Sequence, residues 1–375
     1  MHYLTAGESH GDKLVCIVDD VPSGIALSEK EINFELKRRS SGPGRSSRQD
    51  EESNTCKIVS GVNDGKTTGN PVCVEIENSA TTHEINSYVM RPGHGDLPGV
   101  LKHNFDDSEN VDERTSARET AARLVAGVIA KNLLANFDVE VYGYVSAIGS
   151  VKIKEDEKNL PSGLPSMSDI GVSDVLCPDA KASQQMLKQI DKAAKAGDSL
   201  GGAISLVAVG ALPGLGCYSQ GKNRLDSKLA AAVMSVPSVK NVSVGSADFM
   251  SENLGSASQD TIRKTANGIA YEANYCGGIE AGMTNGMPVC LRAKVKPVPT
   301  LKQAGRAVDL ETMSEIDWAT DRRSDVCVVP NVAVVCESEM ALVLANAYLD
   351  KFGCDTLSDI KFAVDTYRQR IQELN

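Results

Sequence analysis

Residues 116–135 read SARETAARLVAGVIAKNLLA, and they carry the clearest helical pattern in the chain. Ser116 and Glu119 match the Ser-x-x-Glu pattern of a capping box, which marks the start of a helix. The apolar residues that follow recur at the spacing of one helical face: Ala121, Leu124, Val125, Val128, Ile129 and Leu133. This stretch therefore predicts a helix that runs to about Ala135 and buries one face against the rest of the molecule.

The segments on both sides of this helix indicate the fold class. Amphipathic patterns predict helices over 28–39, 181–196, 225–235, 337–351 and 358–374. Alternating or β-branched runs predict strands over 14–18, 72–77, 139–153, 203–209, 239–245, 289–295 and 327–335. These strands come singly and in groups instead of alternating regularly with helices, which favours an α+β fold over a doubly wound parallel sheet.

The charge balance restricts the kind of partner. The chain has 375 residues, with 39 Lys and Arg against 50 Asp and Glu, which gives a formal net charge of −11. Proteins that bind nucleic acid or an anionic membrane surface are usually basic. We therefore expect a small-molecule partner, with no nucleic acid and no membrane.

Three further features concern location, membrane segments and metals. The first residues show no basic start and no apolar stretch of signal-peptide length, which favours a cytoplasmic location. The uncharged run 199–221 is rich in glycine, so a buried strand and a turn are expected there instead of a membrane helix. No two of the ten cysteines have Cys-x-x-Cys spacing, so we expect reduced thiols and no metal site.

Basic residues gather in two segments. Residues 37–48, KRRSSGPGRSSR, place five cations on a turn where guanidinium and backbone N–H groups together can bind phosphate or carboxylate. A solvated surface loop is the alternative. Arg114 and Arg118 lie at the start of the predicted helix, where the macrodipole disfavours cations, so a bound anion is expected there. The alternative is that Arg118 pairs with Glu119 or Asp112.

Two histidines lie in glycine-rich segments, His10 in GESHG and His94 in RPGHGD. An imidazole on such a loop can reach into a cleft and transfer protons near neutral pH.

Residues 61–67, GVNDGKT, resemble a phosphate-binding P-loop, but that loop needs four residues between its glycines and this segment has three. An NTPase is therefore not supported, and the absence of a Gly-x-Gly-x-x-Gly motif argues against a Rossmann dehydrogenase.

Ten segments, taken in order, resemble the motifs of the chorismate synthase family. They are 7–11 GESHG, 39–48, 65–71 GKTTGNP, 91–96 RPGHGD, 114–120 RTSARET, 198–202 DSLGG, 234–240 MSVPSVK, 281–286 AGMTNG, 296–300 KPVPT and 323–330 RSDVCVVP. The resemblance implies an α+β fold in which residues 1–375 form one β-α-β sandwich domain, usually as a homotetramer. It also implies a phosphate-eliminating lyase that makes chorismate, the last common step of the shikimate pathway, with reduced FMN. NADPH would be needed only if the enzyme reduces its own flavin.

The resemblance also assigns site residues. His94 is expected to assist the departing phosphate, His10 to protonate or hydrogen-bond the reduced flavin, and Asp325 to relay the ring proton. The implied FMN contacts are Arg114, Thr115, Ser116, Pro237, Ser238, Ala281, Lys296, Pro297, Val298, Pro299, Thr300 and Arg323. The implied substrate contacts are Arg39, Arg45, Arg48, Arg91 and Arg118.

The expected result is a strongly positive cleft in a negative surface, because these arginines should converge on one anionic ligand. Ser324 and Val326 stand where the family usually has His and Pro. The competing hypothesis is a module that binds flavin or anions through the same arginines and catalyses nothing.

Overall fold

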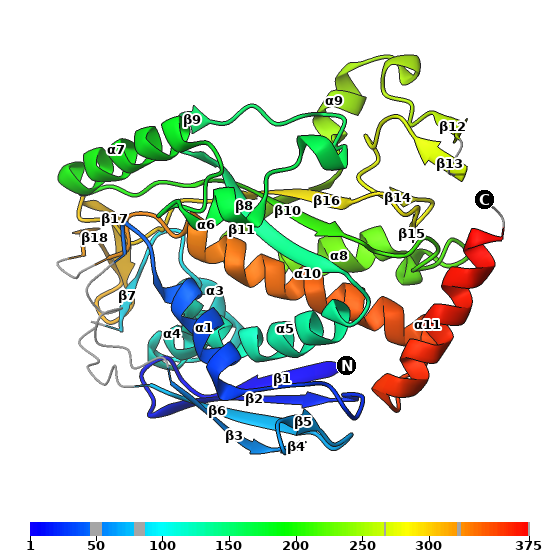
Figure 1. Ribbon diagram of the computed structural model, residues 1–375. Coiled ribbons are helices and arrows are strands. Elements are labelled where there is room, and N and C mark those ends of the chain that lie inside the picture. The colour runs from blue at the N-terminus through cyan, green and yellow to red at the C-terminus, as the bar shows by residue number, and fades with distance from the viewer. Residues whose placement is uncertain (46–54, 79–86, 266–267, 321–323, 374–375) are drawn as a thin grey trace.

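Two antiparallel sheets enclose a layer of helices in the computed structural model, which describes residues 1–45, 55–78, 87–265, 268–320 and 324–373 (Figure 1). The middle layer contains α1 (Glu29–Ser40), α5 (Thr120–Ala135) and α10 (Val329–Phe352). Helix α5 packs against the first sheet and α10 packs against the second, while α5 and α10 contact each other. This arrangement confirms the predicted β-α-β sandwich.

The first sheet has the strand order β1-β2-β6-β3. Its strands are β1 (His2–Ala6), β2 (Lys13–Asp19), β3 (Cys56–Ser60) and β6 (Val72–Glu77). Successive side chains in a strand point to opposite faces. In β2 this alternation buries Leu14, Cys16 and Val18 beneath the helices.

The second sheet has the strand order β11-β16-β10-β8-β9. Its strands are β8 (Glu140–Ile148), β9 (Val151–Lys152), β10 (Gly202–Val209), β11 (Val239–Val244) and β16 (Val289–Val295). The uncharged run forms β10 and the turn after it, as predicted. Nearly all of β8 is buried, because α10 covers one face and a smaller cluster with Tyr144 and Ile170 lies on the other.

The remaining elements surround this sandwich. The other helices are α3 (Asp96–His103), α4 (Glu109–Thr115), α6 (Met167–Gly171), α7 (Ala180–Ala196), α8 (Leu225–Met234), α9 (Ala247–Glu252) and α11 (Leu357–Gln372). The short strands are β4 (Val62–Asn63), β5 (Lys66–Thr67), β7 (Val89–Met90), β12 (Ile262–Thr265), β13 (Gly268–Tyr271), β14 (Ile279–Glu280), β15 (Met283–Thr284), β17 (Gly305–Asp309) and β18 (Ser314–Trp318). The P-loop-like segment is the β4–β5 hairpin, and no helix follows it before β6.

The predicted capping box at Ser116 is wrong. A short 3₁₀ turn, η1 (Ala117–Glu119), precedes α5, and the Ser116 hydroxyl accepts a hydrogen bond from the Arg118 N–H at 3.4 Å. The Glu119 carboxylate lies 2.6 Å from Arg123 one helical turn later. That ion pair directs Glu119 along the helix. The weaker prediction at Ser28 is confirmed, since Ser28 and Glu31 form a complete capping box for α1.

The predicted strand 327–335 is also wrong, because residues from Val329 onward form the first turns of α10. A helix buried on all sides has no polar face, so its run of valines carries no helical period. Among the described residues, α10 is the one helix long and apolar enough to cross a membrane, but 89% of that stretch is buried inside the protein. Its hydropathy therefore reflects its place in the core.

Candidate active site

One cavity of about 360 Å³ lies where η1 and the start of α10 meet several loops. Its lining includes His10, His94 and Asp325, the three side chains predicted to be catalytic. They come from the loop after β1, the loop before α3 and the segment before α10. The fold therefore brings together groups more than 200 residues apart in the chain, in a volume typical of small-molecule sites.

Most of the predicted binding residues that the structure describes line the same cavity. They are Arg39, Arg45, Arg91, Thr115, Ser116, Pro237, Ser238, Lys296, Val298, Pro299 and Thr300. The predictions for Arg48 and Arg323 lie outside the described residues. Pro297 is absent from the lining and lies against Gly201 instead. Ala281 lies in the β14–β15 turn, outside this cavity.

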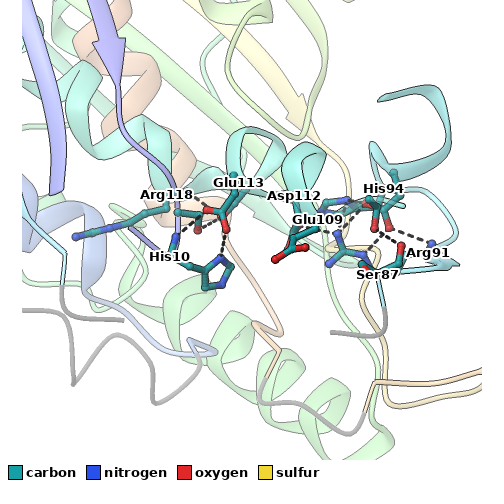
Figure 2. A network of polar contacts seen from close by, with 12 residues as sticks. His10, Ser87, Arg91, His94, Glu109, Asp112, Glu113 and Arg118 are labelled. Carbon is teal, nitrogen blue, oxygen red and sulfur yellow. Dashed lines mark hydrogen bonds and ion pairs between the residues drawn. The ribbon is translucent and has the colours of Figure 1, made fainter. Parts of the chain in front are cut away.

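Arg114 and Arg118 turn away from the cavity. The exposed Arg114 guanidinium donates to the Gly7 carbonyl at 2.8 Å and to the Thr5 hydroxyl at 2.9 Å. The buried Arg118 donates through Nε to Asn78 Oδ1 at 3.1 Å and through Nη2 to the Glu77 carbonyl at 3.2 Å. Figure 2 shows its side chain extending away from His94. The expectation that both arginines face one anion at the helix start is not met by these contacts.

His94 belongs to a corner built on Arg91 (Figure 2). The Arg91 guanidinium donates to Asp96 at 2.6 and 2.7 Å and to Asp112 at 2.6 Å. His94 Nδ1 lies 2.6 Å from Asp96 Oδ1, and its Nε2 lies 4.0 Å from Asp112 Oδ1. An ionised carboxylate only accepts hydrogen bonds, so Asp96 keeps the proton on Nδ1 and sets the orientation of the ring.

The Asp96 carboxylate is the fixed centre of this corner. Its side chain is fully buried at the start of α3. Burial alone would raise the pKa of Asp96, but hydrogen bonds from Arg91 and His94 and their charges outweigh burial and hold this pKa well below its usual range. Asp96 therefore stays ionised and retains both partners throughout the neutral pH range.

His10 is held by a different carboxylate, Glu113. The Glu113 Oε2 atom accepts the backbone N–H of His10 at 2.9 Å, and Oε1 lies 3.1 Å from His10 Nδ1. Both side chains are about nine-tenths buried. This grip on ring and backbone orients the imidazole at the cavity wall. Glu113 was not predicted as a site residue, although it directly precedes the recognised motif 114–120.

Arg45 and Asp325 form an ion pair, with Arg45 Nη1 2.9 Å from Asp325 Oδ2. Their backbones are joined as well, because the Gly44 carbonyl accepts the Val326 N–H at 2.6 Å. Gly44 adopts a φ of +80°, and a Cβ there would lie 2.9 Å from Ile190. Glycine at this position therefore permits the close approach of the basic loop to the segment before α10.

Arg39 crosses the start of α5. Its Nε donates to the Thr120 hydroxyl at 2.9 Å and its Nη2 donates to the Ala117 carbonyl at 2.7 Å. Asn331 in α10 donates to the Arg39 carbonyl and, at 2.8 Å, to the Ser41 carbonyl. Asn331, which was not predicted, thereby ties the basic loop to the cavity.

The chain matches the family model for chorismate synthase over residues 1–349. It belongs to the chorismate synthase family. Chorismate synthase of Bacillus velezensis is 40% identical over 392 residues, covering 100% of both chains. That of Desulforudis audaxviator is 41% identical and covers 100% of this chain and 98% of the relative. A chorismate synthase crystal structure matches with a TM-score of 0.81 at 31% identity, covering 99% of this chain and 98% of the other.

Membership in the chorismate synthase family makes this protein a lyase with a small-molecule substrate. Its cavity differs from the expected strongly positive cleft. Among the described residues, the lining holds four basic side chains, Arg39, Arg45, Arg91 and Lys296, and two carboxylates, Asp112 and Asp325. Two of the arginines are paired with these carboxylates. The cavity lining therefore carries both signs of charge, and carboxylates hold two of its arginines in place.

Lys296 joins two loops of the cavity. Its ammonium group donates to the Gly93 carbonyl at 2.7 Å. Burial, and then the charge of Lys240, lowers the pKa of Lys296. An anionic ligand close to Lys296 would favour its charged form.

Proposed function

We propose that this enzyme converts 5-enolpyruvylshikimate 3-phosphate into chorismate and phosphate by a 1,4-anti elimination that requires reduced FMN without net redox change. The observation that supports this most directly is the single cavity that holds His10, His94 and Asp325 together with three arginines. The substrate carries two carboxylates and a phosphate. Guanidinium groups bind such anions through two parallel hydrogen bonds, and Arg39, Arg45 and Arg91 would supply them.

The residues of the cavity fit a flavin. One part of the lining is apolar, with Val236, Pro237, Val298, Pro299 and Val332, and suits a flat ring system. The polar groups Thr115, Ser116, Ser238, Lys296 and Thr300 would hold the remainder of FMN, and Arg323 would complete the set. Reduced FMN, when bound, supplies an electron transiently and recovers it. NADPH would take part only if the enzyme reduces its own flavin.

His94 would act on the leaving phosphate. With Nδ1–H directed at Asp96, Nε2 is the ring atom left for the ligand, and protonated Nε2 can donate a hydrogen bond. The phosphate gains charge as its bond to the ring breaks. Arg91 and a protonated His94 stabilise that charge with donors already in position.

His10 and Asp325 would handle protons on the flavin side of the site. Glu113 fixes the orientation of the His10 ring, so His10 can hold a hydrogen bond or a proton toward reduced FMN. The Asp325 carboxylate would relay the proton that the substrate ring loses. Arg48 would add a further cation to the substrate site.

The direct test is an anaerobic assay with photoreduced FMN and 5-enolpyruvylshikimate 3-phosphate. Phosphate and chorismate should form in equal amounts. Tight binding of FMN and substrate in calorimetry without phosphate release would support the binding module and reject the lyase reaction. NADPH oxidation with FMN and substrate, without added reductase, tests whether the enzyme reduces its own flavin.

We further propose a cytoplasmic homotetramer in which residues 1–375 form one domain. One hydrophobic cluster extends from Met1 to Val364 and includes both sheets, which supports a single folding unit. Gel filtration with light scattering tests the assembly.

A further inference from the structure

The Arg45–Asp325 ion pair joins a proposed anion-binding group to the proposed proton relay. The Arg45 side chain is 10% exposed and that of Asp325 is 21% exposed. At this degree of burial, a cation that loses its carboxylate partner pays a large desolvation cost unless another anion replaces it. The buried Arg45 guanidinium therefore needs an anion beside it, either Asp325 or a group that replaces Asp325.

Arg45 has donor capacity that the pair does not use. Its Nε atom is buried and, among the residues the structure describes, has no hydrogen-bond partner. Buried polar atoms in proteins are nearly always paired, so an orphaned donor on a cavity wall points to a ligand. A guanidinium group can present Nε and one Nη to a carboxylate or phosphate together.

The backbone around the pair is held independently of the two side chains. The Gly44 carbonyl accepts the Val326 N–H, and Asn331 donates to the Ser41 carbonyl. The Ser324 hydroxyl donates to the Thr300 carbonyl at 2.7 Å. Arg45 can therefore exchange one anion for another by side-chain movement alone.

We propose that an anionic group of the substrate displaces Asp325 from Arg45, so that substrate binding itself releases from this guanidinium the carboxylate that later relays the ring proton. This inference rests on the proposed function. Arg45 then acts as a positioning residue for Asp325 as well as an anion-binding residue. Before the substrate arrives, the Asp325 carboxylate is held by the Arg45 guanidinium.

The test measures binding of inorganic phosphate to the full-length protein by calorimetry, without flavin or turnover. Asp325→Asn removes the carboxylate that competes for Arg45, so phosphate should bind more tightly. We expect the phosphate Kd to fall by about fivefold or more, on a scale in which 1.4 kcal/mol of binding free energy corresponds to a tenfold change in Kd. Asp106→Asn is the control. It removes the same charge from an exposed position outside the cavity lining, so the phosphate Kd should change less than about twofold.

An equal gain of phosphate affinity in both variants would mean that any lost negative charge strengthens binding, and it would overturn the proposal. So would unchanged or weaker phosphate binding in Asp325→Asn. Arg45→Gln supplies a second check, because it should weaken phosphate binding and remove the gain from Asp325→Asn in the double variant. A gain that persists without Arg45 rejects the exchange.

Malonate, a dicarboxylate, distinguishes the two anionic groups. A larger gain for phosphate than for malonate in Asp325→Asn assigns the phosphate group to Arg45, and the reverse assigns a carboxylate. These readouts are independent of chorismate formation. If the wild-type protein forms chorismate but Asp325→Asn gains no phosphate affinity, the anion exchange at Arg45 is rejected and the proposed function stands. If the wild-type protein forms no chorismate but Asp325→Asn does gain phosphate affinity, the proposed function is rejected and the exchange stands.

Discussion

The His94 and His10 corners of the cavity both hold the imidazole ring with a carboxylate, but the groups around the two rings differ. In each, a carboxylate lies against Nδ1 of the ring, 2.6 Å away for His94 and 3.1 Å away for His10. Asp112 and Glu113, adjacent in α4, contribute to opposite corners, Asp112 beside Arg91 and Glu113 beside His10 (Figure 2). One short helix therefore couples the two corners.

The two corners differ in the charged groups that surround the histidine ring. Arg91 adds a guanidinium to the His94 corner and binds two carboxylates there. Glu113 instead binds the ring and the backbone N–H of the same residue, His10. The first arrangement suits an anion that gains charge during the reaction, and the second suits an imidazole whose orientation matters most. The following predictions separate these two roles.

The largest effect is expected for His94→Ala. Loss of a general acid typically lowers the rate by about 10²–10⁴-fold, so kcat should fall by that amount while substrate affinity changes far less. Steady-state kinetics and calorimetry measure the two quantities. His103→Ala, an exposed histidine in the neighbouring helix α3, is the matched control and should retain wild-type turnover. Equal losses of turnover and affinity in His94→Ala would rule out the acid role.

Asp96→Asn should lower the free energy of unfolding, because it removes the carboxylate at the centre of the same corner. Removing one partner of a buried ion pair costs about 3–5 kcal/mol of unfolding free energy. Because the folded pKa of Asp96 is lowered, its stabilisation is present above the ordinary carboxyl pKa of about 4 and is lost as pH falls toward the folded value.

Denaturant unfolding of wild type and variant at a series of pH values measures this effect. The gap between them should be widest at neutral pH and should narrow below about pH 4. A gap that stays constant with pH would show that the ionised carboxylate is not what stabilises the corner.

Glu113→Gln should have a smaller effect, confined to the His10 corner. Residues that orient a functional group typically contribute about 10–100-fold, and the Gln amide oxygen keeps one acceptor for His10. We expect kcat to fall by about tenfold and the acidic limb of its pH profile to move, with little change in stability. Glu109→Gln, an exposed position in the same helix, is the control. A pH profile identical to wild type would remove Glu113 from the chemistry.

No effect is expected for Lys66→Ala. Lys66 is exposed in the β4–β5 hairpin, outside the cavity. Turnover and FMN affinity should therefore match wild type. Loss of activity in this variant would show that the phosphate-binding function extends beyond the two corners.

Sequence patterns predicted the amphipathic and alternating elements well. Strands β6 and β16 begin and end where predicted, and the Ser28 capping box forms. Helix α10 was predicted only from 337 onward, because a segment buried on all sides has no amphipathic period. The prediction at Ser116 failed because Glu119 forms an ion pair with Arg123, one helical turn further along, instead of completing the capping box.

The family motifs in the sequence predicted which histidines, arginines and carboxylates belong to the site, and most of those that the structure describes line one cavity. Only the tertiary structure decided which of them meet. Arg39, Arg45 and Arg91 face the cavity, while Arg114 and Arg118 bind backbone and side-chain groups elsewhere. The physical reason is that an arginine satisfies its donors with whatever acceptors the fold places nearby, and those acceptors come from distant segments.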